Sequence, residues 1–376
     1  MSTPRSAATD LPSYRVEIAP SPDGQGRNGP PDLSPREARN RWLDKLRVSH
    51  AGSSVSAYHY QTKLFVEWCE RNGVNSIRDV DGWDLESYET YRRGQDVKPY
   101  TLQKEMLTLR RFLEYCARIE LVDESLPEKV DPPDAPRDAR VDETMLRPER
   151  AKALLEYYRS TPSARGTRSH ALLELAWYTG ARLGALRALD LGDYNSVEQY
   201  VRFRHAPEED TPLKNGPDGE RVVGIPGEVC DVVDAYIETH RHDVHDDHGR
   251  EPLLASTVGR PSTNAVRAWM YQATVPCLHT DCPHGRERPT CEFLEDSYNN
   301  ASKCPSSRSP HQVRTGSITW QRNRGVPADV VSRRVNSSVR VIEEHYDKPD
   351  EIEEMEKRRR QHLDRLGFNG QEADNE

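Results

Sequence analysis

Lysine is scarce in this chain of 376 residues: ten of its 53 basic residues are lysines and the other 43 are arginines. Acidic side chains number 62, which gives a formal net charge of −9 and a pI near 5.9. This surplus of negative charge argues against nucleic-acid binding through bulk attraction alone. An acidic, lysine-poor surface is typical of proteins that work at high salt, because carboxylates stay hydrated where salt screens other charges. The composition therefore predicts a halophilic host.

Long apolar runs are also missing. The longest, such as residues 171–178, end well short of the ~20 residues that a membrane-spanning helix needs. The polar N-terminus has no apolar core of a signal peptide, so we expect a cytoplasmic protein with no membrane partner. The chain contains no Gly-Lys-Ser/Thr loop for nucleotide phosphates and no internal repeat. These absences exclude a membrane protein, a P-loop nucleotidase and a solenoid.

The N-terminal third predicts a helical bundle. One hydrophobic core usually serves at most about 250 residues, and this chain has 376, so we expect two domains. The first residues are rich in proline and lack a periodic pattern, which is typical of a disordered arm. From Ser34 and Glu37, a capping pair, apolar residues recur at helical spacing, and a proline-rich stretch follows the bundle. The predicted segments are an arm over 1–34, a bundle of about four helices over 35–123, a linker over 124–143, a second domain over 144–368 and a tail over 369–376.

The second domain combines helices with a small sheet. The apolar segment 171–177 predicts a helix, and alternation over 200–203 predicts a strand. Turn residues at 215–219 precede a second strand over 222–225, which indicates an antiparallel hairpin. We therefore predict a fold that is mainly α with a small antiparallel β-sheet (α+β).

Four short motifs in this domain carry chemistry. Arg182 stands at the start of a helix, and Lys214 precedes the hairpin turn. His311 and Arg314, three residues apart, share one helical face and can reach one anion. Tyr346 ends a short helix. Each motif alone is typical of an ordinary surface cation or a core aromatic.

In this order and spacing, the motifs resemble the catalytic domain of the tyrosine recombinases, the phage-integrase family, over about residues 145–350. A haloarchaeal, XerC/D-type member is the expected subgroup. The helical bundle is similar to that family's core-binding (SAM-like) domain. The resemblance implies an enzyme that exchanges strands of double-stranded DNA with no cofactor for catalysis. It also implies a homo-tetramer on paired DNA sites, with a monomer or dimer off DNA.

The resemblance assigns the first catalytic arginine to Arg182, the mobile lysine to Lys214 and the nucleophile to Tyr346. Two positions depart from the family pattern. Ala185 stands where a glutamate is usual, and Asn336 where a histidine or tryptophan is usual. The catalytic residues expected from the resemblance are Arg182, Lys214, His311, Arg314, Asn336 and Tyr346.

These residue types suit transesterification at a phosphodiester. Two guanidiniums can grip phosphate oxygens and stabilise the added negative charge of the transition state. A tyrosine, with a reference pKa near 10, becomes a nucleophile when neighbouring cations favour its phenolate. His311 can accept the phenol proton, and the resemblance gives Lys214 the protonation of the 5′ leaving oxygen.

Positive charge gathers around the motifs. Residues 306–340 hold seven arginines and one acidic residue, whereas residues 228–251 hold eight acidic residues and two arginines. In the bundle, basic residues outnumber acidic ones between Lys98 and Arg118, and we expect the helix from Thr101 to contact the major groove. The predicted DNA-binding residues are Lys98, Lys104, Arg110, Arg111, Arg308, Arg333 and Arg334.

Four of the seven cysteines lie within 28 residues, in a stretch with little apolar material. Thiols in an intracellular protein are metal ligands more often than disulfides. We therefore predict a structural zinc site made by Cys277, Cys282, Cys291 and Cys304 in an insert over 277–304, with His279 or His284 as substitutes.

The sequence predicts a site-specific DNA recombinase or integrase of a mobile element or virus. It leaves open a type IB topoisomerase, which relaxes DNA without exchanging partners, and a catalytically inactive DNA-binding relative. A zinc-dependent structural adaptor explains the cysteines but not the four motifs.

Overall fold

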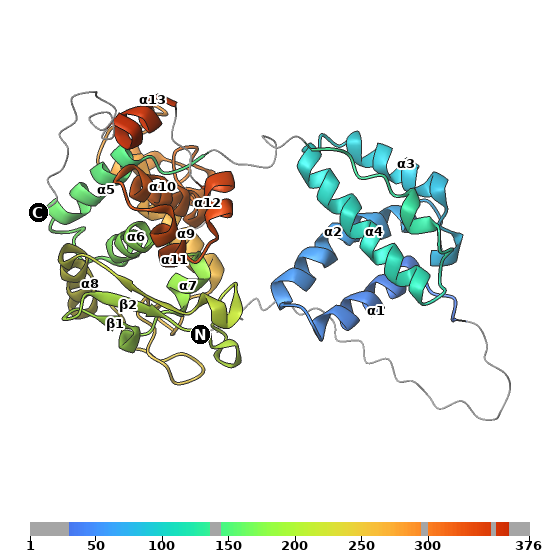
Figure 1. The fold of residues 1–376 in the computed structure, drawn as a ribbon, viewed down its shortest axis with the longest axis horizontal. Helices are drawn as coiled ribbons and strands as arrows, with labels where there is room; N and C mark the ends of the chain where they lie inside the picture. Colours follow the sequence, from blue (N-terminus) through green and yellow to red (C-terminus); the bar gives the residue numbers. More distant parts are fainter. Residues whose placement is uncertain (1–29, 136–143, 295–299, 347–350, 361–376) are drawn as a thin grey trace, which may run out of the picture. The chain divides into compact units, whose positions relative to one another are not determined.

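The computed structural model describes residues 30–135, 144–294, 300–346 and 351–360 of the chain. The chain divides into two compact units, residues 1–141 and residues 142–376, which are coloured blue to cyan and green to red in Figure 1. Residues 1–29 of the arm predicted over 1–34, and the predicted tail over 369–376, lie outside the described residues. No helix within the described ranges is long and apolar enough to span a membrane.

The first unit is built from four helices. Ser34 and Glu37 form the predicted capping box, with each side chain bonded to the other's backbone N–H, so this helix start is confirmed. Phe65, Phe112 and Leu113 are fully buried at the centre. An ion pair between Arg92 and Glu105 at 2.9 Å is buried beside them. The helices are α1 (Pro35–Arg47), α2 (Gly52–Arg71), α3 (Gly82–Arg93) and α4 (Pro99–Arg118).

The first unit extends further than the sequence predicts. A 3-10 helix, η2 (Leu126–Lys129), packs on α4, and Leu126 and Val130 belong to the buried core of the unit. Arg110 on α4 also donates to the carbonyl oxygen of Val130. Proline at the start of a 3-10 turn is compatible with a packed segment, so residues 124–130 are not part of a linker.

The second unit surrounds a central helix, α6 (Arg168–Thr179), which is buried on almost every side. Helices α8, α9 and α10 contact it (Figure 1). The other helices of the unit are α5 (Pro148–Ser160), α7 (Leu183–Ala188), α8 (Gly227–Thr239), α9 (Thr263–Ala273), α10 (Pro310–Asn323), α11 (Ala328–Val335), α12 (Val339–His345), α13 (Glu351–Glu354) and the π-helical η10 (Met355–Arg359).

A three-stranded antiparallel sheet in the order β1-β2-β3 completes the second unit, which confirms the predicted fold class. The strands are β1 (Tyr194–Asn195), β2 (Tyr200–Phe203) and β3 (Arg221–Gly224). Val201 pairs with Val223, and both side chains are buried. Strands β2 and β3 pair as the antiparallel hairpin that the sequence predicts, but the connection between them is not a short turn. It is a long loop that includes two 3-10 turns, η5 (Pro207–Glu209) and η6 (Gly216–Gly219).

Two glycines allow the segments of the second unit to approach closely. Gly180 ends α6 in the left-handed conformation, with φ of 59°, and an added Cβ would lie 2.8 Å from Cγ1 of Val335. An added Cβ at Gly316 on α10 would lie 1.9 Å from the carbonyl oxygen of Leu146. The sequence around Gly180 therefore turns sharply against the end of α11, and α10 lies directly on the chain that enters the unit.

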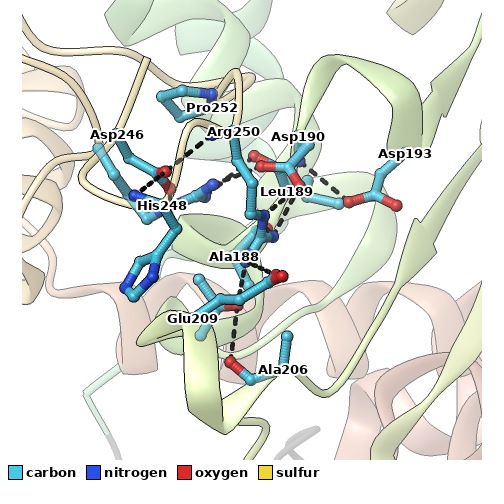
Figure 2. A network of polar contacts seen from close by, with 12 residues as sticks. Ala188, Leu189, Asp190, Asp193, Ala206, Glu209, Asp246, His248, Arg250 and Pro252 are labelled. Carbon is cyan, nitrogen blue, oxygen red and sulfur yellow. Dashed lines mark hydrogen bonds and ion pairs between the residues drawn. The ribbon is translucent and has the colours of Figure 1, made fainter.

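A buried polar network holds the loops beyond α7 (Figure 2). Asp190, 6% exposed, accepts hydrogen bonds from Arg250 at 2.8 Å and from Arg260. Arg260 also pairs with Asp246 at 2.7 Å, and Arg250 reaches Glu209 at the rim at 2.9 Å. The paired charges fix the loop over 246–260 against the end of α7, because each buried guanidinium has a carboxylate partner.

Replacing Asp190 by alanine is expected to destabilise the second unit by about 1.5–3 kcal/mol, because Arg250 and Arg260 lose their shared carboxylate although each keeps a second carboxylate partner. Chemical denaturation followed by circular dichroism measures the loss. Glu209→Ala is the matched control, since Glu209 is half-exposed and a surface pair contributes about 0–1 kcal/mol. Equal stability of the two variants would contradict this account of the network.

Candidate active site

Arg314 lies at the centre of the candidate site and is 1% exposed. Ser309 and Gln312 form a capping box at the start of α10, whose first residue is Pro310, and the next turn carries Arg314 inward. Its Nη1 donates to the carbonyl oxygen of Gly180 at 2.5 Å. Its Nε and Nη2 have no hydrogen-bond partner among the described residues. Burial, and secondarily the charge of Arg182, lowers the pKa of Arg314 to about 10, so it is still charged at pH 7.

Three consecutive carbonyl oxygens at the end of α11 hold three arginines from three different elements. Arg221, Arg314 and Arg182 donate to the carbonyl oxygens of residues 334, 335 and 336, at 2.7, 2.8 and 2.7 Å. The last carbonyls of a helix lack partners within the helix and carry partial negative charge, so they suit cations. The end of α11 thus gathers arginines that are far apart in the sequence.

Arg221 is a third cation of this cluster. Its Nη1 donates to the carbonyl oxygen of Gly219 at 2.8 Å, and its guanidinium carbon lies 4.2 Å from the ring centroid of Phe203. Burial, followed by the charges of Arg314 and Arg182, lowers the pKa of Arg221 to about 10. Nothing in the sequence distinguishes an arginine at the start of a short strand, so Arg221 is absent from the predicted site.

The cluster has no carboxylate of its own. Ala185, which stands where the family has a glutamate, is buried at 6% exposure in the core of the second unit. In the part of the chain that the structure describes, none of Arg182, Arg221 and Arg314 forms an ion pair. Partly or fully buried cations held by neutral carbonyls and aromatic rings keep a net positive field, which is complementary to an anion such as a phosphate.

Tyr346 lies against this cluster at the end of α12. Its side chain is 7% exposed and packs in a small core with Ile318 and Ile342. The ring centroids of Tyr346 and His311 are 5.3 Å apart, and the guanidinium carbon of Arg314 lies 4.9 Å from the Tyr346 ring. Residues from two motifs that are separated by α11 in the sequence are therefore neighbours, as a phosphate site with a tyrosine nucleophile requires.

Lys214 lies in the β2–β3 loop with its side chain exposed. The preceding residue, Leu213, is buried, and its N–H donates to Nδ1 of His205 at 2.9 Å. The next residue, Asn215, donates from Nδ2 to Oδ1 of Asn336 at 2.6 Å. The structure thus brings the loop of Lys214 to the end of α11, where the arginines meet.

The predicted DNA-binding residues fall into two groups. Lys98, Lys104, Arg111 and Arg333 are exposed. The other three donate to backbone carbonyls of their own unit: Arg110 to Val130, Arg308 to Met145 and Pro305, and Arg334 to Tyr178 and Gly224. The three residues of this second group stabilise the fold through these contacts. A role in DNA contact stays a prediction for all seven residues.

The four cysteines of the insert are free thiols. Burial raises the pKa of the Cys277 thiol, and Cys291 is buried at 7% exposure. Among the described residues, no group of three or more His, Cys, Asp and Glu side chains is arranged to hold a metal ion. The structure therefore gives the predicted zinc site no support.

Among curated proteins, a tyrosine recombinase XerC from Roseiflexus sp. (strain RS-1) is 26% identical over 191 residues, which are 51% of this chain and 57% of that protein. A tyrosine recombinase XerC from Herpetosiphon aurantiacus is 23% identical over 219 residues, which are 56% of this chain and 65% of that protein. The matched region is less than two thirds of the length of either relative. No protein-family model matches the chain.

Solved structures share the architecture. The Tn1549 transposon integrase in complex with a circular intermediate DNA is 13% identical, with a TM-score of 0.59 over 89% of this chain and 100% of that chain. A lambda integrase dimer bound to a COC′ core site is 12% identical, with a TM-score of 0.55 over 92% of this chain and 81% of that chain. The N-terminal domain of a phage integrase from Haloarcula marismortui is 51% identical over 28% of this chain and 100% of that chain, with a TM-score of 0.27. The first two likenesses show that this chain has the fold of those integrases.

Sulfate is expected to stabilise the DNA-free protein by occupying the arginine cluster, because an anion pairs the unpartnered donors of Arg314. At matched ionic strength, exchanging chloride for sulfate should raise the Tm more in the wild type than in Arg314→Met, as differential scanning fluorimetry measures. Arg340→Met is the matched control, since the Arg340 side chain is 84% exposed on α12. Equal sulfate responses in all three proteins would show only the general salting-out effect and would contradict an anion site at Arg314.

Proposed function

We propose, since this chain belongs to the tyrosine recombinase family, that it cuts and rejoins double-stranded DNA at specific sites. The observation that carries the proposal is the cluster of buried Arg314 with half-buried Arg182 and Arg221, which has no carboxylate partner among the described residues and in which Arg314 lies against the ring of Tyr346. Such a cluster is costly in the protein alone and matches a phosphodiester beside a nucleophile.

In the proposed reaction, Oη of Tyr346 attacks the scissile phosphorus and the bond from phosphorus to the 5′ oxygen breaks. His311 accepts the phenol proton, and Lys214 donates a proton to the leaving oxygen. The products are a 3′-phosphotyrosyl bond and a free 5′ hydroxyl. Attack by a 5′ hydroxyl from another duplex reverses the steps, so the exchange needs no ATP and no cofactor.

The arginines supply the electrostatic part of the mechanism. Guanidiniums that already lie in fixed positions stabilise the charge of the pentacoordinate phosphorus without reorganising. Removing one such donor from a preorganised site typically costs about 10²–10³ in rate. Their lowered pKa values of about 10 leave Arg314 and Arg221 protonated at neutral pH, so the cluster keeps its charge where the enzyme works.

We propose double-stranded DNA as the partner, with a homo-tetramer assembled on paired sites. A lambda integrase tetramer bound to a Holliday junction has a TM-score of 0.54 with this chain at 13% identity, which supports this choice. In the single chain, η10 lies on its own unit: Lys357 pairs with Glu149 at 3.7 Å and Arg358 donates to Asn323 at 2.8 Å. The residues that follow Arg360 lie outside the described ranges.

Two alternatives are tested by the same chemistry. A type IB topoisomerase would form the phosphotyrosyl bond but would not exchange partners between paired sites. An inactive DNA-binding relative would form no bond, yet Arg182, Lys214, His311, Arg314 and Tyr346 are all present. The curated relatives are named tyrosine recombinases, which supports exchange.

The zinc hypothesis for the insert is separate from catalysis, and metal analysis of the purified protein tests it.

A nicked suicide duplex that carries the cognate site should give a covalent, SDS-resistant adduct at high salt, because the short cleaved strand diffuses away and blocks religation. Tyr346→Phe should lose the adduct entirely, as gel electrophoresis shows, while its DNA affinity stays close to that of the wild type. An adduct that persists in Tyr346→Phe would mean that another residue is the nucleophile. Paired duplexes that give adducts but no exchanged products would favour the topoisomerase alternative.

DNA binding should persist at salt concentrations that release most DNA-binding proteins. Salt weakens contacts between cations and phosphates by opposing counterion release, so a protein adapted to high salt must draw part of its affinity from contacts that release no counterions, such as those to the bases. Fluorescence anisotropy of a labelled duplex over a KCl series measures the affinity, and circular dichroism measures folding over the same series. Dissociation at ordinary salt with no gain in folding would contradict the halophilic prediction while leaving the recombinase proposal intact.

A further inference from the structure

We propose that Asn336 is a positioning residue that latches the Lys214 loop to the arginine cluster, and that it does not contact the scissile phosphate. The proposal rests on the proposed function, because it concerns how Lys214 is presented to the leaving oxygen. It assigns a role to the position where the family has a histidine or tryptophan and this chain has asparagine.

The backbone of Asn336 has an unusual conformation. The residue caps α11 with φ of 51° and ψ of 64°, in the left-handed region that asparagine adopts more readily than most residues. This turn directs its carbonyl oxygen to Nη1 of Arg182, at 2.7 Å. The main chain of Asn336 therefore holds the first arginine of the cluster.

The side chain of Asn336 is bound to the β2–β3 loop. Its Oδ1 accepts from Nδ2 of Asn215 at 2.6 Å, and its Nδ2 donates to the carbonyl oxygen of Asp218 at 2.8 Å. Both ends of the amide are thus engaged by the loop, and these bonds join positions 121 and 118 residues apart. One of the two N–H donors of Nδ2 is used by Asp218, and the two bonds together fix the plane of the amide toward the loop.

The latch fixes the main chain on both sides of Lys214. On one side, Leu213 is buried and bonded to His205. On the other side, Asn215 is bound to Asn336, and the N–H of Gly216 closes the turn on the carbonyl oxygen of Leu213 at 3.0 Å. The lysine side chain stays exposed between these two anchors, so it can reach an incoming duplex from a defined base.

The same residue therefore couples the general acid to the phosphate site. Its carbonyl positions Arg182, and its amide positions the loop of Lys214. A small misplacement of a catalytic group costs about 10²-fold in rate, so loss of the latch should slow cleavage by one to two orders of magnitude. The loss should fall on the step that Lys214 serves, the protonation of the 5′ oxygen.

A suicide duplex with sulfur in place of the 5′ bridging oxygen tests this assignment. A thiol is far more acidic than an alcohol, so a sulfur leaving group needs no general acid. Asn336→Ala, Asn215→Ala and Lys214→Ala should all cleave the oxygen substrate more slowly and recover on the sulfur substrate. Arg314→Lys, which disturbs the phosphate contact, should stay slow on both substrates.

The outcomes separate the latch from the proposed function. If Asn336→Ala is equally slow on both substrates, Asn336 acts on the phosphate and the latch is wrong. If Asn336→Ala or Asn215→Ala cleaves the oxygen substrate faster than the wild type, the contact restrains Lys214 and the positioning role is also wrong. If the wild type forms no adduct at Tyr346 on either substrate, the proposed function itself fails.

Digestion with an endoproteinase specific for lysine gives a readout without DNA. The chain has ten lysines, so cleavage after Lys214 can be followed by mass spectrometry against few other sites. Proteolysis requires local opening of the loop, so Asn336→Ala and Asn215→Ala should raise the rate of cleavage after Lys214 severalfold. Cleavage after the exposed Lys152 is the internal control. An unchanged rate after Lys214 in both variants would overturn the latch.

Discussion

The site depends on three consecutive carbonyl oxygens at the end of α11. They accept hydrogen bonds from arginines that arrive on β3, on α10 and at the start of α7. Carboxylates would hold the same guanidiniums more strongly, but they would also neutralise them. Carbonyl dipoles at a helix end fix the arginines and leave most of their positive charge available. The unusual turn at Asn336 and the close approach allowed by Gly180 both follow from this requirement, because each brings a carbonyl oxygen to a guanidinium.

Arginines in two parts of the second unit have different kinds of partner. In the network around Asp190, the buried arginines Arg250 and Arg260 have carboxylate partners, and these pairs stabilise loops (Figure 2). In the cluster around Arg314, the described residues supply no carboxylate, and Ala185 is a plain core residue. A structural arginine is thus distinguished from a phosphate-binding arginine by its partners and not by its burial. The chain's negative total of −9 is compatible with a positive cluster at Arg314, because no carboxylate among the described residues pairs with that cluster while the carboxylates around Asp190 pair with other arginines.

The sequence predicts the fold class well, because helix caps and strand alternation are local or nearly local signals. The capping box at Ser34, strand β2 and the α10 face shared by His311 and Arg314 are examples. The packing of residues 126–130 could not be predicted, since prolines suit a linker and a packed 3-10 turn equally. Arg221 and the inward turn of Arg334 could not be predicted either, because only tertiary contacts decide which arginine faces a carbonyl and which faces solvent.

The position of Asn336 shows how a departure from a family pattern changes the contacts within a site. A histidine or tryptophan in that place would carry a ring, and the shorter amide instead spans from Asn215 to Asp218 with an acceptor and a donor. The main-chain carbonyl oxygen of Asn336 accepts from Arg182 at the same helix end that holds Arg221 and Arg314. The backbone and the side chain of Asn336 therefore serve two different contacts, one to the arginine cluster and one to the β2–β3 loop, so a single residue joins these two parts of the structure.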